Sequence, residues 1–405
     1  MHILIIPGEE LNEKNTYSSV FELHQAKALQ QAGLQCGFVS IYINGNLIQN
    51  IKNLLLFKIN AIPLLKTLVN SKKINLLKVH GFNVVESVGY YVWAGKFKTK
   101  YQEQARLGLR AYKTYVNQFG KPDLIHAHSR FLTGGLIALA IKKKYNIPFV
   151  LTEHSTFYAR DLVTKHDLEL TKELINNSRT WIAVSPELGK LVTSLLQAKA
   201  NKNFNYIPNV LDPYFENEEV ALLANNNKFV FLNIASLESK KGHDILLKSF
   251  ALAFGGNLFF QLQIGGSGDL ETQLKKQVIT LKLENQVTFL GQLNRTEIIE
   301  TYRKANVFVL PSLYETFGVV LIEALAMGKP IIATKCGGPE NIVTEKNGVL
   351  VEPNNAEQLS DAMQNIAKVW SNFSPKLLKD TCISKFGSVK FASSMQIVYS
   401  QTLGI

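Results

Sequence analysis

Short apolar runs alternate with longer segments of helical spacing along the first half of the chain. The apolar runs lie at residues 3–6, 36–41, 84–88, 124–127, 149–152, 181–184 and 205–207. Apolar residues recur with helical spacing at residues 20–32, 99–119, 134–144, 167–176 and 186–198. Such alternation predicts right-handed βαβ units that build a parallel sheet.

The same alternation begins again after a polar segment at residues 217–228. Strands are predicted at residues 229–235, 259–264, 286–289, 307–310, 330–333 and 348–351. The chain is therefore expected to form two doubly wound parallel-sheet domains of the α/β class, joined near residues 210–228. Ligands of open α/β sheets bind beyond the carboxyl ends of strands, so two facing domains would form one interdomain cleft.

Composition excludes several classes of protein. The 405 residues are 46% hydrophobic and 19% charged, with 26 Gly and 12 Pro, which excludes a disordered, collagen-like or coiled-coil chain. The apolar runs are shorter than the roughly 18 residues of a spanning helix, and the start lacks the basic leader of a signal peptide. The three cysteines show no disulfide or metal spacing, and a cytoplasmic location is expected.

The formal charge of +12 lies entirely in the first half of the chain. Residues 1–212 hold 26 Lys and Arg against 14 Asp and Glu, and the remaining residues hold 18 of each. Such asymmetry suggests an anionic partner, either a lipid surface or a nucleic acid. Lysines interleave with apolar and aromatic residues over residues 47–100, which is typical of an interfacial helix or hairpin, although a solvated lysine-rich face explains it equally well.

The segment 310–330 contains the most particular pattern. A strand ends near Leu310, a helix is predicted over residues 318–327, and Gly328 ends it. Glu315 then lies in the loop after the strand, and Glu323 lies on an otherwise apolar helix. Carboxylates accept hydrogen bonds from hydroxyls and a helix N-terminus attracts phosphate, so a nucleotide sugar fits this segment. The alternative is that Glu323 is buried for structural pairing and Glu315 is a solvated loop acid.

Two further strand ends carry candidate anion-binding groups. The sequence Gly265-Gly266-Ser267-Gly268 joins a strand to a helix, as an anion site requires, although a tight turn without a ligand explains it as well. Lys241 follows the strand at residues 229–235 and is placed to approach a diphosphate as a point charge. Taken alone, such a lysine is more often a surface residue.

Histidines mark the corresponding strand ends of the first half. His126 and His128 point the same way from one strand, but no third ligand at metal spacing accompanies them. We expect His128 to hydrogen-bond substrate and His126 to pack in the sheet edge. Glu153 and His154, after the next strand, are acceptor-side candidates. The chain has no Asp-x-Asp motif, so we expect no metal in the site.

Together these segments resemble the retaining glycosyltransferases of family 4, of the bacterial polysaccharide and glycoconjugate type. These enzymes have the GT-B fold of two facing Rossmann-like domains. The resemblance covers nearly the whole chain and is strongest over residues 229–353. The matching motifs are Lys241-Gly242, Gly266-Ser267-Gly268, residues 287–291, Glu315 with Phe317-Gly318 and Glu323-Ala324, Gly328-Lys329-Pro330, Gly337-Gly338-Pro339-Glu340, and Asn347-Gly348.

The resemblance implies a division of labour between the domains. Residues 1–212 would bind the acceptor, with a C-terminal helix at about residues 389–405 packing back on them, and residues 213–388 would bind a nucleoside diphosphate sugar. Glu315 would contact the donor sugar, Glu323 the ribose and Lys241 the diphosphate. The remaining implied contacts are backbone amides at Phe317, Gly318 and Val319 to phosphate, Gly266 in the glycine loop, Leu290 at the base pocket, and His128 to sugar and phosphate.

The sequence departs from the family pattern at two donor-binding positions. Ser236 stands where the family often has an arginine, so half of the usual cationic clamp is absent or supplied elsewhere. Ser18 and Ser19 stand where members usually have glycines near the donor, and Ser19 still offers a backbone amide.

The resemblance implies transfer of the sugar to an acceptor hydroxyl with retention of anomeric configuration, without cofactor or metal. His128, Glu315 and Lys241 would be the catalytic residues. The positive first half favours a lipid-linked saccharide at the inner membrane face, in glycan or exopolysaccharide biosynthesis. The alternatives are a sugar-nucleotide 2-epimerase of the same fold and a catalytically silent nucleotide-binding scaffold. Nucleic-acid binding leaves the donor motifs unexplained.

Overall fold

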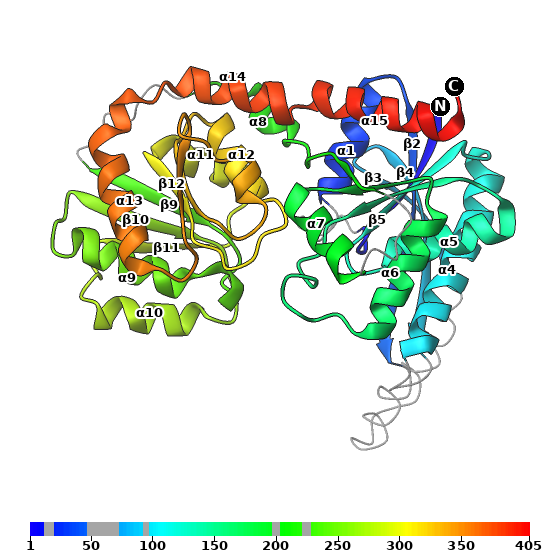
Figure 1. Cartoon of the computed structure of the whole chain (residues 1–405), viewed down its shortest axis with the longest axis horizontal. Helices are drawn as coiled ribbons and strands as arrows, with labels where there is room; N and C mark the ends of the chain where they lie inside the picture. The colour runs from blue at the N-terminus through cyan, green and yellow to red at the C-terminus, as the bar shows by residue number, and fades with distance from the viewer. Residues whose placement is uncertain (12–19, 47–72, 92–96, 197–202, 221–227) are drawn as a thin grey trace, which may run out of the picture. The chain divides into compact units, whose positions relative to one another are not determined.

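The computed structural model describes residues 1–11, 20–46, 73–91, 97–196, 203–220 and 228–405 (Figure 1). The chain divides into two compact units. The first comprises Met1–Val184, Gly189–Ile207 and Phe391–Ile405, and the second comprises Ser185–Leu188 and Pro208–Lys390. The sequence placed the division at residues 212 and 213, and the structure places it a short way earlier.

The first unit is built on an eight-stranded sheet in the order β3-β4-β2-β1-β5-β6-β7-β8. Its strands are β1 (His2–Ile6), β2 (Gln35–Asn46), β3 (Ile74–Val79), β4 (Phe82–Tyr91), β5 (Leu124–Ser129), β6 (Phe149–Glu153), β7 (Thr180–Ala183) and β8 (Asn205–Tyr206). The central strands β1 and β5 are buried along almost their whole length, as expected of a sheet covered on both faces. The described strands pair in parallel, except that β3 is antiparallel to β4.

The edge strand β3 corrects the expectation of a wholly parallel sheet. It forms a two-residue hairpin with β4 through His80 and Gly81, whose φ angles are 49° and 88°. Positive φ at both central positions is the geometry of the tight hairpin turn. The sequence pattern missed β3 because Leu76 and Leu77 of this edge strand are 52% and 38% exposed, so it has no alternation of buried and exposed positions.

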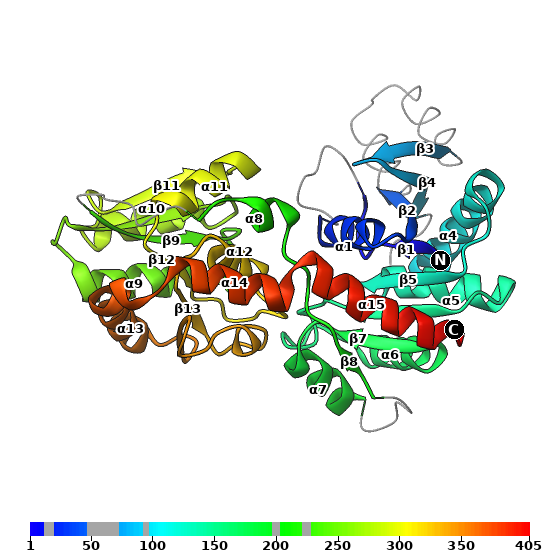
Figure 2. The same ribbon diagram turned by 90° about the horizontal axis from the view of Figure 1, so that it is seen from above.

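Helices cover both faces of the first sheet (Figures 1 and 2). They are α1 (Val20–Gln31), α4 (Phe97–Phe119), α5 (Thr133–Tyr145), α6 (Lys165–Asn177), α7 (Pro186–Leu195) and α15 (Ser388–Leu403). Helix α4 packs against β2, β4 and α5, and α5 packs against β1, β5 and α6. Helix α15 lies beside α1, where Gln396 Nε2 donates to Ala32 O at 3.2 Å, and reaches β5 through Tyr399.

No helix among the described residues is long and apolar enough to cross a membrane.

The second unit is built on a six-stranded parallel sheet in the order β11-β10-β9-β12-β13-β14. Its strands are β9 (Phe229–Ile234), β10 (Phe260–Gly265), β11 (Val287–Gly291), β12 (Val307–Leu310), β13 (Ile331–Thr334) and β14 (Gly348–Val351). Its α-helices are α8 (Pro213–Asn217), α9 (His243–Phe254), α10 (Glu271–Thr280), α11 (Arg295–Lys304), α12 (Val319–Ala326), α13 (Ala356–Val369) and α14 (Pro375–Phe386). One apolar core joins α9, α10 and α13 to a face of the sheet, and α11 and α12 contact strands of the same sheet.

Strand order fixes where each unit can bind a ligand. In the first unit β1 lies between β2 and β5, and in the second unit β9 lies between β10 and β12. From each of these two strands the chain builds first one side of the sheet and then the other. The loops after the neighbouring strands therefore leave in opposite directions, which opens a crevice at the carboxyl ends of the strands. The loops after β1 and β5, and those after β9 and β12, are therefore where chemistry is expected.

Candidate functional site

The loops after β9 and β12 touch at the switch point of the second unit. The loop after β9 contains a short 3₁₀ turn, Ser239–Lys241, and ends at Gly242. The Leu313 amide donates to Lys240 O at 2.8 Å. Gly242 has φ 66°, and a Cβ there would lie 2.1 Å from Pro311 O. Only glycine permits this close approach of the two loops. Gly242 is therefore needed for packing, and Lys241 supplies the charge.

This approach brings Lys241 and Glu315 into contact. Lys241 Nζ lies 2.6 Å from Glu315 Oε1, and Ser312 Oγ donates to the same oxygen at 2.9 Å. The side chains of Lys241 and Glu315 are only 18% and 11% exposed. The structure thus brings together two residues that the sequence assigned to one site. It adds Ser312, for which the only sequence signal was its place three residues before Glu315.

The turn at Gly337-Gly338 fixes the backbone of Glu315. The Glu315 amide donates to Cys336 O at 3.3 Å, and Gly338 N donates to Glu315 O at 2.8 Å. A Cβ at Gly338 would lie 2.3 Å from the Phe317 backbone. Glu340 accepts from the Gly337 amide at 3.0 Å and so orders this turn. The sequence quoted these residues as a motif but assigned them no role.

The loop continues into the N-terminus of α12. Gly318 caps this helix with φ 94°, and no side chain caps its first amides. The Phe317 side chain is buried and packs edge-on against Phe386 at 5.7 Å between ring centroids. Only backbone atoms of Phe317 are therefore placed to meet a ligand, and Gly318 and Val319 start a helix whose dipole favours an anion.

Glu323 lies one turn further along α12, in a partly buried position. Burial and, to a smaller extent, the nearby Asp212 raise its pKa, Arg295 opposes them, and together they bring it to about 8. Arg295 forms its ion pair with Asp212 at 2.9 Å and stacks over the Tyr214 ring at 4.7 Å. A carboxyl group with this pKa is protonated at neutral pH and can donate as well as accept hydrogen bonds.

The glycine loop after β10 differs from the expected anion site. The Gly266 amide donates to Gly291 O at 2.7 Å, so it is not available to an anion. Gly266 has φ 129°, and a Cβ there would lie 2.0 Å from Ala235 O. Glycine is therefore required by close packing of the loops after β9 and β10. At the end of β11, Leu290 is half-buried and its role stays a prediction.

The two positions that depart from the family pattern have different outcomes. Ser236 hydrogen-bonds Glu238, whose carboxylate also pairs with Lys240 at 2.9 Å. Ser236 thus belongs to a local polar cluster beside Lys241. Ser19, with Ser18, lies outside the described residues.

Three histidines cluster toward the carboxyl ends of β5 and β6 in the first unit, with His126 and His128 buried and His154 partly buried. His128 Nδ1 lies 3.0 Å from His154 Nε2. His126 contacts Thr152 Oγ1 at 2.8 Å through Nε2 and the Tyr399 hydroxyl at 2.7 Å through Nδ1. Burial lowers the pKa of His126 and of His154 to about 3, so both rings are neutral at pH 7. His126 is buried on the central strand β5, and not at the sheet edge where the sequence analysis expected it.

His128 and Glu153 are more enclosed than the sequence suggested. His128 is 0% exposed, and its Nε2 has no hydrogen-bond partner in the described part of the chain. Glu153 is buried and accepts from the amides of His154 and Ser155 at 3.0 and 2.8 Å. Burial raises the Glu153 pKa to about 7. Its bonds order the loop after β6, and the substrate roles of His128, Glu153 and His154 stay predictions.

Within the described ranges, no group of three or more His, Cys, Asp or Glu side chains is arranged to hold a metal ion. Cys36, Cys336 and Cys382 are free thiols.

Comparison with solved structures identifies the class of fold. An Anabaena protein, HepE, solved in complex with UDP, superposes with a TM-score of 0.71 at 19% identity, covering 99% of this chain and 100% of that one. Both units thus belong to the GT-B fold of two Rossmann-like α/β domains.

Family models and relatives identify the family. Residues 215–373 match the model for glycosyl transferases group 1, and residues 56–214 match that for glycosyltransferase family 4. The chain belongs to these glycosyltransferases. An uncharacterized glycosyltransferase of Methanocaldococcus jannaschii is 26% identical over 74% of this chain and 77% of its own length. Glycogen synthase of Mycobacterium tuberculosis is 27% identical over 64% of each chain, so this chain matches less than two thirds of that enzyme.

Proposed function

We propose that this glycosyltransferase moves a sugar from a nucleoside diphosphate sugar to a hydroxyl of a saccharide or lipid-linked saccharide, with retention of anomeric configuration. The observation that carries the proposal is the Lys241–Glu315 pair. It joins the loops after β9 and β12 at the switch point, beside the uncapped N-terminus of α12. A cation, a carboxylate and the first amides of a helix thus all belong to the loops after β9 and β12.

Each group suits one part of such a donor. Lys241 and the amides at Gly318 and Val319 would hold the diphosphate and stabilise the charge that grows on it as the sugar departs. Glu315 would accept hydrogen bonds from the sugar hydroxyls, and Glu323 would bind the ribose hydroxyls. The UDP complex of HepE supports a nucleotide donor for this site.

The reaction would form a bond between the acceptor oxygen and the anomeric carbon on the face from which the diphosphate leaves. The bond from the anomeric carbon to the diphosphate breaks, and the departing diphosphate takes the proton of the acceptor hydroxyl. No protein base or nucleophile is needed, and positioning with electrostatic stabilisation supplies most of the rate. We expect the reaction to proceed without a metal ion.

The surface of the first unit supports an acceptor at an anionic membrane. Lys73, Leu76, Leu77 and Lys78 are each exposed on β3 and the residue before it, with Leu76 and Lys78 on one face of the strand and Leu77 on the other. Exposed leucines flanked by lysines suit the interface of an anionic bilayer. Flotation with anionic and with neutral liposomes tests this part, and Lys73→Glu with Lys78→Glu should abolish any preference for the anionic lipid. Equal flotation with both liposomes would remove the membrane from the proposal.

The donor is tested by thermal-shift measurements of the whole protein with UDP, GDP, ADP and their sugar conjugates. A nucleotide that binds the folded protein raises its Tm by mass action. The dependence of this rise on nucleotide concentration reports the affinity. NMR of the anomeric proton in the product then reads retention or inversion directly. Release of an isomerised nucleotide sugar without an acceptor would establish the epimerase alternative, and binding without turnover on any acceptor would establish a scaffold.

A further inference from the structure

His128 is held between two other histidines at the carboxyl end of β5. On one side its ring lies 4.1 Å from the ring of His126, measured between centroids. His126 is itself fixed at both ring nitrogens, by Thr152 and by Tyr399. On the other side the rings of His128 and His154 are stacked, with centroids 5.2 Å apart and an angle of 27° between their planes. The ring of His128 therefore has little freedom to turn.

The main chain of His154 is tied to the end of β5. Its amide donates to Ser129 O at 2.9 Å and to Glu153 Oε1 at 3.0 Å. The Ser155 amide donates to the same carboxylate oxygen at 2.8 Å. The bond to Ser129 continues the pairing of β5 with β6 past the last residue of β6. This arrangement brings His154 Nε2 to 3.0 Å from His128 Nδ1.

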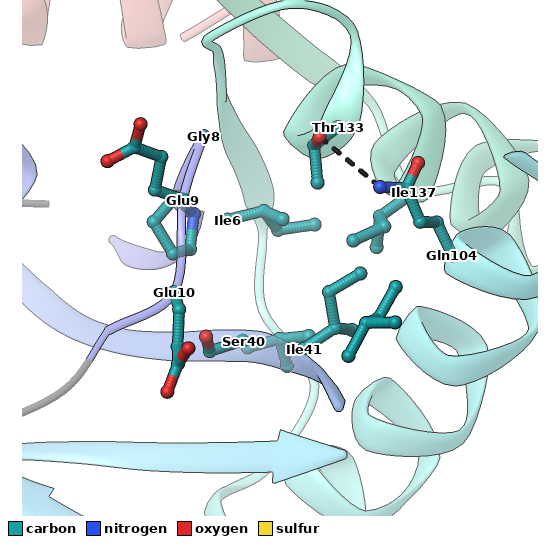
Figure 3. Close-up of a pocket in the computed structure, with 12 residues that line it drawn as sticks. Ile6, Gly8, Glu9, Glu10, Ser40, Ile41, Gln104, Thr133 and Ile137 are labelled. Atoms are coloured by element: carbon teal, nitrogen blue, oxygen red, sulfur yellow. Dashed lines mark hydrogen bonds between the residues drawn. The ribbon is translucent and has the colours of Figure 1, made fainter. Parts of the chain in front are cut away.

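The switch point of the first sheet has space close to His128. A cavity of about 200 Å³ opens where β1 ends, and Gly8 is part of its lining (Figure 3). A Cβ added to Gly8 would lie 3.3 Å from His128 O, so the main chain of His128 supports the rim of this cavity. Ligands of α/β units bind at such switch points. A ligand bound there therefore lies near the end of β5 that carries His128.

Only one ring nitrogen of His128 is engaged within the part of the chain that the structure describes. Nδ1 meets His154, whereas Nε2 has no hydrogen-bond partner there. The ring is fully buried, and an unpartnered polar atom is costly in such surroundings. A ligand oxygen at Nε2 would remove this cost, and a hydrogen bond in so dry a setting is strong.

The position of one proton decides what Nε2 of His128 can bind. Burial lowers the pKa of all three histidines, so each ring is neutral at pH 7 and carries one N–H. In the bond between His128 and His154 one nitrogen must therefore donate and the other accept. If His128 donates from Nδ1, its Nε2 is a bare acceptor. If His154 donates, His128 keeps its own proton at Nε2 and can donate it to a ligand.

The chemistry of a nucleoside diphosphate sugar favours the second arrangement. Ionised phosphate oxygens only accept hydrogen bonds, whereas sugar hydroxyls both donate and accept. A bare nitrogen would repel a phosphate oxygen, because both atoms carry lone pairs. An N–H at Nε2 serves both the sugar and the phosphate that the family resemblance assigns to His128.

We propose that His154 is a positioning residue for His128. His154 donates its Nε2–H to His128 Nδ1, so that His128 carries its proton at Nε2 and presents an N–H donor to the oxygens of the donor substrate. The inference rests on the proposed function. It gives His154 a role different from the acceptor contact that the sequence suggested.

The first test locates the proton by NMR of the whole protein labelled with nitrogen-15 histidine. Proton–nitrogen correlation spectra distinguish a ring protonated at Nε2 from one protonated at Nδ1. Coupling between the two nitrogens across their hydrogen bond identifies the pair, and His128→Gln assigns the signals. We expect the bonding proton on His154 Nε2 and the proton of His128 on its own Nε2. A bonding proton on His128 Nδ1 would overturn the proposal, whether or not any variant folds.

The second test measures binding of UDP-glucose, GDP-glucose and ADP-glucose by isothermal titration. His154→Phe keeps an aromatic ring but cannot donate, whereas the amide of His154→Gln can donate in its place. We expect His154→Phe to weaken the nucleotide sugar that binds by about fivefold to tenfold, and His154→Gln to stay within about threefold of the native protein. The matched control, His166→Phe at an exposed position of α6, should leave the affinity unchanged.

Two results of the titrations would refute the role of His154. One is an affinity in His154→Phe equal to that of the native protein. The other is an equal loss in His154→Phe and His154→Gln, which would show that the ring matters only for packing. If none of the three nucleotide sugars binds the native protein, the donor site of the proposed function fails, and the NMR measurement still decides which histidine donates.

Discussion

Lys241 Nζ lies 2.6 Å from Glu315 Oε1 across 74 residues of sequence. The two residues lie in the loops that follow the neighbouring strands β9 and β12, and strand order reverses between these two strands. Each holds the other in place, and Ser312 fixes the same carboxylate oxygen. The site therefore carries a pre-positioned cation beside an acceptor of hydrogen bonds, which lowers the cost of ordering both groups when a donor binds.

Replacing Lys241 should mainly weaken nucleotide binding, whereas replacing Glu315 should mainly slow turnover. Lys241→Met is expected to weaken a nucleoside diphosphate by at least about tenfold, because it removes a charge-assisted contact worth roughly 1.5–3 kcal/mol. Glu315→Gln should keep nucleotide affinity within about threefold and lower kcat by about a hundredfold or more, since it acts on the transferred sugar. Isothermal titration with the nucleotide and steady-state kinetics measure the two effects.

The matched control for this pair is Lys335 with Glu352, an ion pair of 2.7 Å whose side chains are 48% and 52% exposed. Lys335→Met and Glu352→Gln should change neither affinity nor kcat, because exposed ion pairs contribute little. Unchanged nucleotide affinity in Lys241→Met would show that the diphosphate lies elsewhere.

Gly242 is expected to be needed for the contact between the two loops. In Gly242→Ala the new Cβ would meet Pro311 O at 2.1 Å, and φ of 66° would add strain. The loops after β9 and β12 must then separate, so we expect a lower Tm and loss of the nucleotide thermal shift. Gly256→Ala is the control, since φ is 80° there but nothing lies within 4 Å of the added Cβ.

Because both alanines carry the strain of positive φ, only the clash distinguishes the two variants. Gly256→Ala should cost about 1 kcal/mol and keep nucleotide binding. Equal losses in both variants would mean that backbone strain, and not the approach of the loops, explains the effect of Gly242→Ala.

Hydrophobic periodicity predicted the order of strands and helices along the chain, because the parallel strands are short and mainly apolar. It failed at β3, whose leucines are exposed at the sheet edge. Hydrophobic burial supplies no signal for such a strand, and the sequence analysis did not use the His80-Gly81 turn that follows it.

Those residues of the candidate site that come shortly after a strand could be predicted from the sequence. Lys241 and Glu315 were candidates because each follows a strand, the family resemblance assigned both to the donor site, and the fold does bring them together. The role of Gly266 was not predictable, because its amide is taken by Gly291 O, which only tertiary structure reveals. Which ring atoms of His128 and His154 meet was not predictable either, because the orientation of the two rings depends on their packing.

Glu323 should make stability depend on pH. Its pKa is about 8 in the folded chain, against an ordinary value of 4.5 when unfolded. Between these values the unfolded chain releases the proton and the folded chain keeps it, so this group lowers stability as pH rises from about 4.5 to 8. Below that window the effect vanishes, and above it the effect is constant.

Glu323→Gln removes the titration and isolates the effect. The Tm of the variant relative to the native protein should rise by a few degrees between pH 5 and pH 8.5, measured by calorimetry. Glu284→Gln, at an exposed position, should show no such trend. A constant difference in Tm across this range would mean that Glu323 ionises normally in the folded protein.

The Tyr399 hydroxyl should fasten helix α15 to the first sheet. It lies 2.7 Å from His126 Nδ1, and both side chains are buried. His126 Nε2 is already engaged with Thr152 Oγ1, so Tyr399→Phe leaves a buried ring nitrogen without its partner. A loss of about 1–2 kcal/mol is expected, with faster amide hydrogen exchange along α15. Tyr145→Phe, at a half-buried position on α5, is the control and should change neither quantity. If exchange in α15 is the same in Tyr399→Phe as in the native chain, apolar packing alone holds the helix, and the hydroxyl contributes nothing to its docking.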